Sequence, residues 1–151
     1  MRRILIAIIL ALLINSNAIG QINKLAANIG YEYMQKNSGY LGAEYRINNN
    51  NLKNTQGPLN VGVGTYLYSS KGEFSAAPEI HINQTWMHFL ITEFSASTKN
   101  IKPSVGISLM NLTRLQFGYS IPINHSEFKG FYFGFHILIG RSPFYDEIKI
   151  Y

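Results

Sequence analysis

The fold of this chain follows from one run of ten residues near its end, Phe131-Tyr132-Phe133-Gly134-Phe135-His136-Ile137-Leu138-Ile139-Gly140. Every odd position carries a large apolar side chain, while the even positions carry mainly Gly, His or Tyr. Side chains on a β-strand point alternately to opposite faces. The run therefore predicts a strand with one apolar face and one small or polar face.

Seven further segments show the same alternation or a strand-like composition. Turn-forming residues such as Ser69-Ser70-Lys71-Gly72 separate them, and an Asn-rich stretch at 48–58 predicts a longer loop. The segment 87–97 is strand-like but ambiguous in face, and Pro78 indicates either a bulge or a weaker strand. No segment has helical periodicity. The eight predicted strands are 25–34, 41–48, 59–68, 74–83, 87–97, 104–110, 114–123 and 131–140.

The first twenty residues have the features of a secretory signal peptide. Arg2 and Arg3 precede an unbroken apolar run at 4–14, and small residues follow at Ala18 and Gly20. The run is too short to span a bilayer as a helix, and cleavage after either small residue fits equally well. We therefore predict a signal peptide at 1–20, a β-barrel domain at 21–141, and a tail at 142–151 that is either a periplasmic extension or the end of the last strand.

Composition narrows the classes of protein to which this chain can belong. The formal net charge of +5 is spread without a basic cluster, which argues against nucleic acid as a partner. There is no cysteine, so neither a disulfide scaffold nor a lipid anchor on cysteine is expected. The four histidines have no paired ligand spacing, so we expect no metal, and nothing indicates another cofactor.

The glycines indicate which face points into the barrel. All eight glycines within the predicted strands lie on the polar side, opposite the Phe, Tyr, Ile and Leu residues. The interior of an eight-stranded barrel is just wide enough for side chains to fill, so its inner face needs small residues. Bulky groups turned outward supply the apolar band and the aromatic rims of a membrane barrel, here Tyr31, Tyr33, Tyr45, Tyr119 and Phe131. Alternation alone also fits a soluble lipocalin-like carrier, whose apolar face is turned inward.

The signal peptide, the length of the chain after it, the eight strands and their alternation resemble the small outer-membrane barrels of the OmpA and OmpX type. The resemblance covers 21–151 and is architectural, because no fingerprint motif accompanies it. It implies an all-β fold, an eight-stranded antiparallel up-and-down transmembrane β-barrel, in the outer membrane of a Gram-negative bacterium. It also implies outer-membrane lipid as the surroundings, and periplasmic chaperones and the barrel assembly machinery as partners during biogenesis. Tyr151 fits the aromatic end of such barrels, although Arg141-Ser142-Pro143 interrupts the alternation before it.

The inward face carries charges that need partners, because an unpaired buried charge is costly. We predict a salt-bridge and hydrogen-bond network that plugs the lumen. The alternative is a catalytic or proton-relay use of its Glu and His residues, but no nucleophile stands at a recognisable spacing, so no catalytic residue is assigned. The predicted network consists of Glu32, Glu44, Arg46, Glu79, His81, Arg114, Gln116 and His136.

Function is predicted in outline. Short loops at 36–39, 69–72, 98–103 and 124–130 offer little surface to a host partner. A plugged lumen is also unlike that of a general porin, which needs about 16 strands. We expect an outer-membrane barrel without enzymatic activity, with a structural role or a place in an envelope protein complex. One alternative is an outer-membrane lipid-modifying enzyme, working by acyl transfer or deacylation, in which His125 and Ser126 would act. The other is the soluble secreted carrier.

Overall fold

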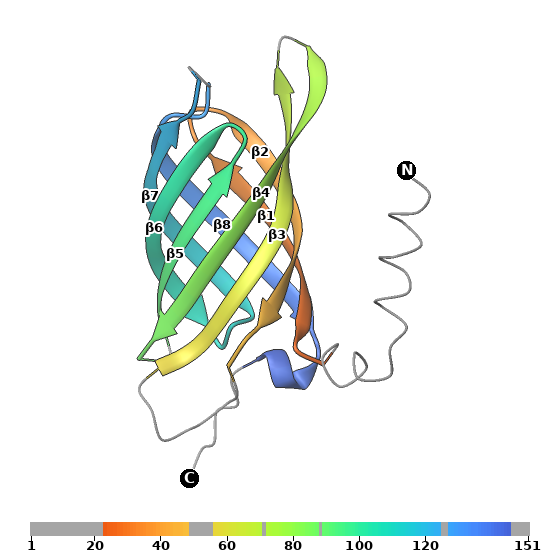
Figure 1. The fold of residues 1–151 in the computed structure, drawn as a ribbon, viewed down its shortest axis with the longest axis vertical. Coiled ribbons are helices and arrows are strands. Elements are labelled where there is room, and N and C mark those ends of the chain that lie inside the picture. The colour runs from red at the N-terminus through yellow and green to blue at the C-terminus, as the bar shows by residue number, and fades with distance from the viewer. Residues whose placement is uncertain (1–22, 49–55, 71, 88, 125–126, 146–151) are drawn as a thin grey trace, which may run out of the picture.

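The computed structural model describes residues 23–48, 56–70, 72–87, 89–124 and 127–145. They form a closed barrel in which each strand pairs antiparallel with the next and the last pairs with the first (Figure 1). The strands are β1 (Leu25–Tyr33), β2 (Asn37–Arg46), β3 (Gln56–Ser70), β4 (Glu73–Trp86), β5 (Leu90–Ser97), β6 (Asn100–Leu109), β7 (Thr113–Pro122) and β8 (Gly130–Gly140). One 3₁₀ turn, η1 (Ser142–Phe144), follows β8. No helix among these residues has the length and apolarity needed to cross a bilayer.

Pairing of β8 with β1 closes the wall of the barrel. The paired residues run from Ala26 opposite Gly140 to Tyr33 opposite Phe133. Where all eight strands overlap, closure leaves no strand edge with unpaired N–H and C=O groups. The prediction of an all-β, eight-stranded, antiparallel up-and-down barrel is confirmed.

Alternation divides each strand into an inner and an outer side. In β1, Asn28 and Glu32 are buried, whereas Ile29 and Tyr31 are exposed. The same sorting identifies the inward face of β5, which the sequence pattern left ambiguous. Glu93 is buried, and its neighbours in the strand alternate around it. The small and polar sides therefore line the lumen, and the bulky apolar sides form the outer wall.

Strand β5 begins three residues later than predicted. The expected segment 87–97 starts at Met87, but that residue has a positive φ of 48° and belongs to the turn after β4. The left-handed backbone interrupts the extended conformation that strand pairing requires. Leu90 is consequently the first residue of the strand.

One predicted loop is mostly strand. We expected a loop at 98–103, whereas β6 begins at Asn100, so two residues separate it from β5. The Ser97 hydroxyl accepts hydrogen bonds from the backbone N–H groups of Lys99 and Asn100, each at 3.0 Å, which allows so short a turn. Pro103 hides this strand in the sequence, because proline is rare inside sheets.

Three smaller differences concern the ends and continuity of strands. β2 begins at Asn37 and β3 at Gln56, inside the predicted loops 36–39 and 48–58. Pro78 causes no bulge, because the register between β3 and β4 runs unbroken on both sides of it. The register shift in this pair lies instead near the start of β3.

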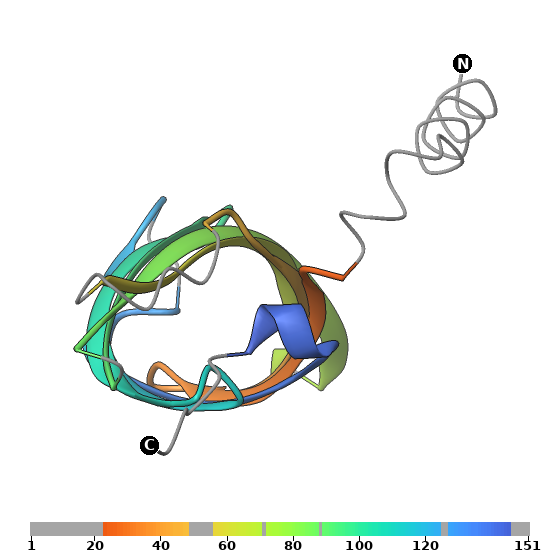
Figure 2. The ribbon, with the colours of Figure 1, turned by 90° about the horizontal axis from the view of Figure 1, so that it is seen from below.

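The two ends of the barrel differ. At the terminal end, where β1 begins and β8 ends, η1 lies over one side of the opening when the barrel is viewed along its axis (Figure 2). At the opposite end, the hairpin end, β3 and β4 project past the other strands (Figure 1). These two strands have 15 and 14 residues, whereas the others have between 8 and 11.

Candidate functional site in the barrel lumen

The charged side chains of the strands gather inside the barrel. Eight strand residues carry a charge, and of these Glu73, at the tip of the β3–β4 hairpin, is exposed. With His81 and His136, which are also buried, the rest make the lumen the candidate functional site. The seven buried residues are Glu32, Glu44, Arg46, Glu79, Glu93, Lys102 and Arg114.

A lysine lies at the centre of the group of charges nearer the hairpin end. Lys102 Nζ lies 2.9 and 2.8 Å from the carboxylate oxygens of Glu32 and 3.1 Å from Glu79 Oε2. The rings of Tyr66 and Tyr132 flank the same ammonium, with centroids 4.7 and 4.4 Å away. Two carboxylates and two aromatic faces therefore hold this cation in a buried position.

A second group lies nearer the terminal end and is centred on Glu44. Arg114 Nη1 donates to both carboxylate oxygens of Glu44, at 2.7 and 2.8 Å, and Arg114 Nη2 donates to Asn111 Oδ1 at 2.6 Å. Asn28 Nδ2 also donates to Glu44 at 2.7 Å, and His81 Nε2 lies 3.1 Å from it. The carboxylate of β2 is thus bound by side chains from β1, β4 and β7, which ties these strands together across the lumen.

Histidine and tyrosine side chains connect the two groups. His136 Nδ1 lies 3.0 Å from Asn28 Oδ1, and its Nε2 lies 3.3 Å from Glu32 Oε1. The Tyr40 hydroxyl lies 3.1 Å from His81 Nδ1, and the Tyr40 ring packs edge-on against His136 with centroids 5.1 Å apart. A continuous network of side chains therefore links the hairpin end of the lumen with its terminal half.

Two glycines of β3 make room for these rings. A Cβ atom on Gly64 would overlap the Tyr40 hydroxyl, and one on Gly62 would overlap the His81 imidazole. Small residues on one strand therefore face large ones on its neighbours, as the narrow interior of an eight-stranded barrel requires.

The residues that follow β8 fold across the terminal opening. Phe144 is fully buried and packs with Ala26 and Leu138. Arg46 Nη1 donates to the backbone carbonyl oxygens of Phe144 and Tyr145, at 3.2 and 3.0 Å. The described part of the predicted tail, 142–145, therefore does not continue β8, and the remainder of the tail lies outside the described residues.

Hydrogen bonds join this turn to the lumen network. Asn111 Nδ2 donates to the Phe144 carbonyl at 3.0 Å, while its Oδ1 accepts from Arg114. The Tyr145 hydroxyl accepts from a backbone N–H of β8 at 2.6 Å and donates to a backbone carbonyl of the same strand at 3.0 Å. The turn and the network thus form one connected plug.

The structure places all eight residues of the predicted network in the lumen. Gln116 Oε1 accepts a hydrogen bond from the Tyr132 hydroxyl at 3.4 Å. Arg46 holds carbonyl oxygens of the C-terminal turn, a partner that strand alternation does not predict. The other six belong to the groups described above: Glu32, Glu44, Glu79, His81, Arg114 and His136.

The predicted network omits Lys102 and Glu93. Lys102 falls in the loop expected at 98–103, and Glu93 falls in the strand of ambiguous face. A signal for the lysine is present in the sequence, because alternation extended backwards from Ser104 reaches Lys102 and Asn100. The sequence carries no such signal for the tyrosine rings that fill the lumen nearer the hairpin end, because Tyr also occurs at many outward positions.

The catalytic alternative concerns residues outside the described part. His125 and Ser126 both lie there. Within the described residues, His81 and His136 contact Glu, Asn and Tyr partners, and neither has a Ser, Thr or Cys nucleophile as its partner. The described part of the chain contains no group of three or more His, Cys, Asp or Glu able to hold a metal ion.

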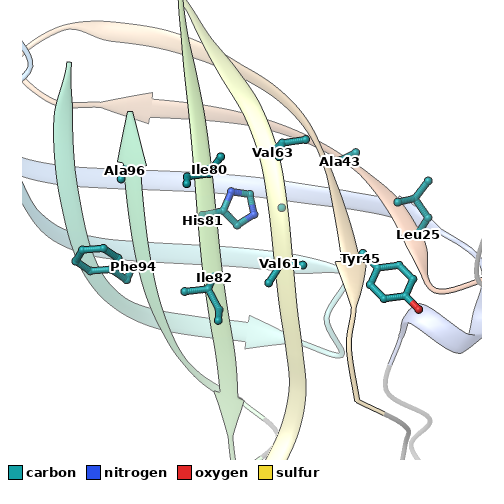
Figure 3. Close-up of a pocket in the computed structure, with 11 residues that line it drawn as sticks. Leu25, Ala43, Tyr45, Val61, Val63, Ile80, His81, Ile82, Phe94 and Ala96 are labelled. Atoms are coloured by element: carbon teal, nitrogen blue, oxygen red, sulfur yellow. The ribbon is translucent and has the colours of Figure 1, made fainter. Parts of the chain in front are cut away.

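A hollow of about 510 Å³ lies on the outer wall, over β1 to β5 (Figure 3). His81 is the polar exception in its lining, and its ring is engaged with Tyr40 and Glu44 on the lumen side. The hollow therefore presents apolar surface to its surroundings. The apolar side chains around it are Leu25, Ala43, Tyr45, Val61, Val63, Ile80, Ile82, Phe94 and Ala96.

Neither a protein-family model, nor a curated protein, nor a solved structure matches this chain. What can be said of its function therefore follows from the barrel and from its two unlike faces.

Proposed function

We propose that this chain is an integral outer-membrane β-barrel with a closed polar lumen, which serves a structural role or acts as a subunit of an envelope assembly. One observation carries this proposal: seven of the eight charged strand residues are buried in the lumen, and the outer wall between the barrel ends is apolar. A bilayer favours this sorting, because a transmembrane barrel needs an apolar band outside and accommodates polar groups inside.

The outer wall exposes more apolar surface than a water-soluble monomer usually carries. Twenty-eight large hydrophobic side chains of the described residues are exposed, whereas the largest apolar patch on a soluble monomer covers roughly 300–600 Å². Contact with lipid accounts for such a wall. Every strand contributes, for example through Ile29, Leu41, Val63, Ile80, Phe94, Val105, Phe117 and Ile137.

Among the described residues, the charges outside the strands lie at the two barrel ends, where lipid headgroups and water would surround them. At the terminal end they are Lys24 and Arg141, and at the hairpin end they are Lys36, Lys99, Glu127 and Lys129. Lys36 and Glu127 form an ion pair that joins two loops of the hairpin end. Charge is thus excluded from the middle of the outer wall, as an apolar bilayer core requires.

Aromatic side chains border the apolar band. Trp86 and Phe89 are exposed near the terminal end. Near the hairpin end, the exposed rings are Tyr31, Tyr33, Phe74, Tyr119 and Phe131. Such rings favour the interface between acyl chains and headgroups, which supports two membrane interfaces at these levels.

A soluble lipocalin-like carrier would need the opposite arrangement, with its apolar side chains around an internal cavity. Here Lys102, Arg114 and their carboxylate partners occupy the interior. The described residues therefore favour a membrane barrel over a carrier.

The closed lumen supports a structural role rather than transport. Ion pairs cross it at two levels and η1 lies over one side of its terminal opening. On this proposal, residues 1–20 direct export, and the assembly route is that of the OmpA and OmpX barrels which the chain resembles, in a Gram-negative envelope with periplasmic chaperones and the barrel assembly machinery.

Fractionation of cells that express the full chain tests this proposal. We expect the protein in the outer-membrane fraction, and we expect detergent-extracted protein to migrate differently on a gel before and after boiling. A soluble periplasmic protein, followed in the same cells, serves as the control for leakage between fractions. Recovery of the folded protein from the soluble fraction without detergent would contradict the proposal.

A further inference from the structure

Glu93 differs from the other carboxylates of the lumen. Glu32, Glu44 and Glu79 each have a Lys or Arg nitrogen within 3.1 Å. Among the described residues, Glu93 has no basic nitrogen at ion-pair distance, and its hydrogen-bond partner is Asn83 Nδ2 at 3.3 Å. A carboxylate in this position needs a counter-charge, because burial removes the water that would otherwise stabilise it.

Two buried hydroxyls stand beside this carboxylate. Ser104 lies directly opposite Glu93 in the β5–β6 ladder, and Ser95 follows two residues later on the same face of β5. Within the described part of the chain, neither hydroxyl has a hydrogen-bond partner, although both side chains are more than nine-tenths buried. Directly opposed residues bring their Cβ atoms to about 4.5–5.5 Å. One carboxylate without a basic partner and two hydroxyls without hydrogen-bond partners therefore share a small region of the lumen.

Negative charge accumulates in this region. Asn83 Nδ2 lies 3.3 Å from a carboxylate oxygen of Glu44 and also 3.3 Å from one of Glu93, so two carboxylates share one amide donor. Arg114 compensates the charge of Glu44. On the other side of the amide, Glu93 has no Lys or Arg partner of its own among the described residues.

We propose that Glu93, Ser95 and Ser104 bind a small monovalent cation, Na⁺ or K⁺. The carboxylate supplies the charge, the two hydroxyls supply neutral oxygen ligands, and water completes the coordination. His81 and Lys102 are the residues opposite Ser95 in the neighbouring strands. With these groups nearby and one carboxylate available, the site does not suit Ca²⁺, which takes six to eight oxygens and usually several carboxylates.

The cation also has a structural consequence. It neutralises Glu93 and joins the hydroxyl of β6 to the carboxylate of β5, the shortest strand of the barrel with 8 residues. The inference concerns the interior alone, so its test does not depend on where the barrel resides in the cell.

Thermal unfolding of the full chain, folded in detergent, tests the proposal in NaCl, KCl and choline chloride at equal ionic strength. Choline is too large for the site, so it controls for general salt effects. We expect the unfolding midpoint of the wild type to rise by roughly 3–6 °C in the favoured alkali salt at ten times its Kd, relative to choline. We expect the midpoint of Glu93→Gln to be the same in all three salts, since it keeps the shape of the side chain without its charge.

Two further variants, one outside the proposed site and one within it, extend the test. Glu73→Gln removes an exposed carboxylate of the hairpin and should respond to the salts as the wild type does. Ser104→Ala should weaken the response without changing the charge. Identical wild-type midpoints in the three salts would overturn the proposal. An undiminished response in Glu93→Gln would overturn it as well, by placing the cation elsewhere.

Discussion

The two sides of a single strand in this barrel follow opposite rules. On β4, Ile80 and Ile82 point outward and are 64 and 45% exposed, whereas Glu79 and His81 alternate with them and are 3 and 6% exposed. The outward side chains have in common only that they are apolar. The inward ones have particular partners on distant strands, such as the Lys102 ammonium for Glu79.

This contrast separates two kinds of requirement. In the membrane proposed for this barrel, the outer wall needs apolarity, so one aliphatic residue can replace another there, whereas a charge at the bilayer centre is destabilising. The lumen needs specific pairs, because removal of one partner leaves a buried charge or donor without compensation. Substitutions matched between the two sides therefore test the comparison directly.

Removal of the central lumen cation has the largest expected effect. Lys102→Met leaves Glu32 and Glu79, which bind the same Nζ, without their counter-charge. Loss of one partner from a buried ion pair lowers the free energy of unfolding by about 3–5 kcal/mol. Urea unfolding of the barrel in lipid vesicles measures this loss. Lys99→Met, in the β5–β6 turn, is the control, and an equal loss there would remove the distinction between lumen and surface charge.

A charge on the outer wall is the complementary change. Val63, in the middle of β3, is 60% exposed, and Val63→Arg should lower the free energy of unfolding in vesicles by about 2–4 kcal/mol. Glu73→Arg, at the hairpin tip, should cost at most about 1 kcal/mol, because it lies beyond the apolar band. In a water-soluble barrel Val63→Arg would instead be neutral and would improve solubility without detergent, so this variant also discriminates between the two environments.

One methyl group distinguishes the two sides at a smaller scale. Gly64→Ala places a Cβ where the Tyr40 hydroxyl lies, and such overpacking costs about 1–3 kcal/mol. Gly39→Ala faces outward, with the nearest atom 4.0 Å from the new Cβ, and should be neutral or slightly stabilising. Urea midpoints of the two variants give the comparison. Destabilisation of similar size in both would mean that interior space is not what Gly64 provides.

The smallest expected effect is at the C-terminal turn. Tyr145→Phe removes a hydroxyl that bonds to the N–H of Gly140 and to the carbonyl of Leu138. The free energy of unfolding should fall by about 1 kcal/mol, and hydrogen exchange at the Gly140 amide should become faster. Tyr119→Phe removes a hydroxyl from the outer wall, where the ring is 59% exposed, and should leave stability unchanged. Unaltered exchange at Gly140 in Tyr145→Phe would show that the turn does not hold the end of β8.

Strand positions and faces were predictable wherever alternation is uninterrupted. The faces of β1 and β8 are predicted correctly and their bounds to within one residue, because inward and outward positions alternate along them without a break. Prediction was less accurate at β5 and β6. The left-handed backbone of Met87 shifts the start of β5. Because of Pro103, residues 98–103 are predicted as a loop, although 100–103 belong to β6. Lys102 was lost from the predicted network for this local reason, not because its role is unusual.

The sequence by itself determined that this chain forms eight strands, which side of most of them is inward, and that most of its strand charges are buried. These properties depend on a period of two residues, which is local and can be read along the chain. Only the tertiary structure decided the partners. Glu32 on β1 meets Lys102 on β6, 70 residues later, and the turn that follows β8 returns to Arg46. Such contacts depend on how the sheet closes and on which strands then face each other across the lumen, and alternation within a strand carries no information about either.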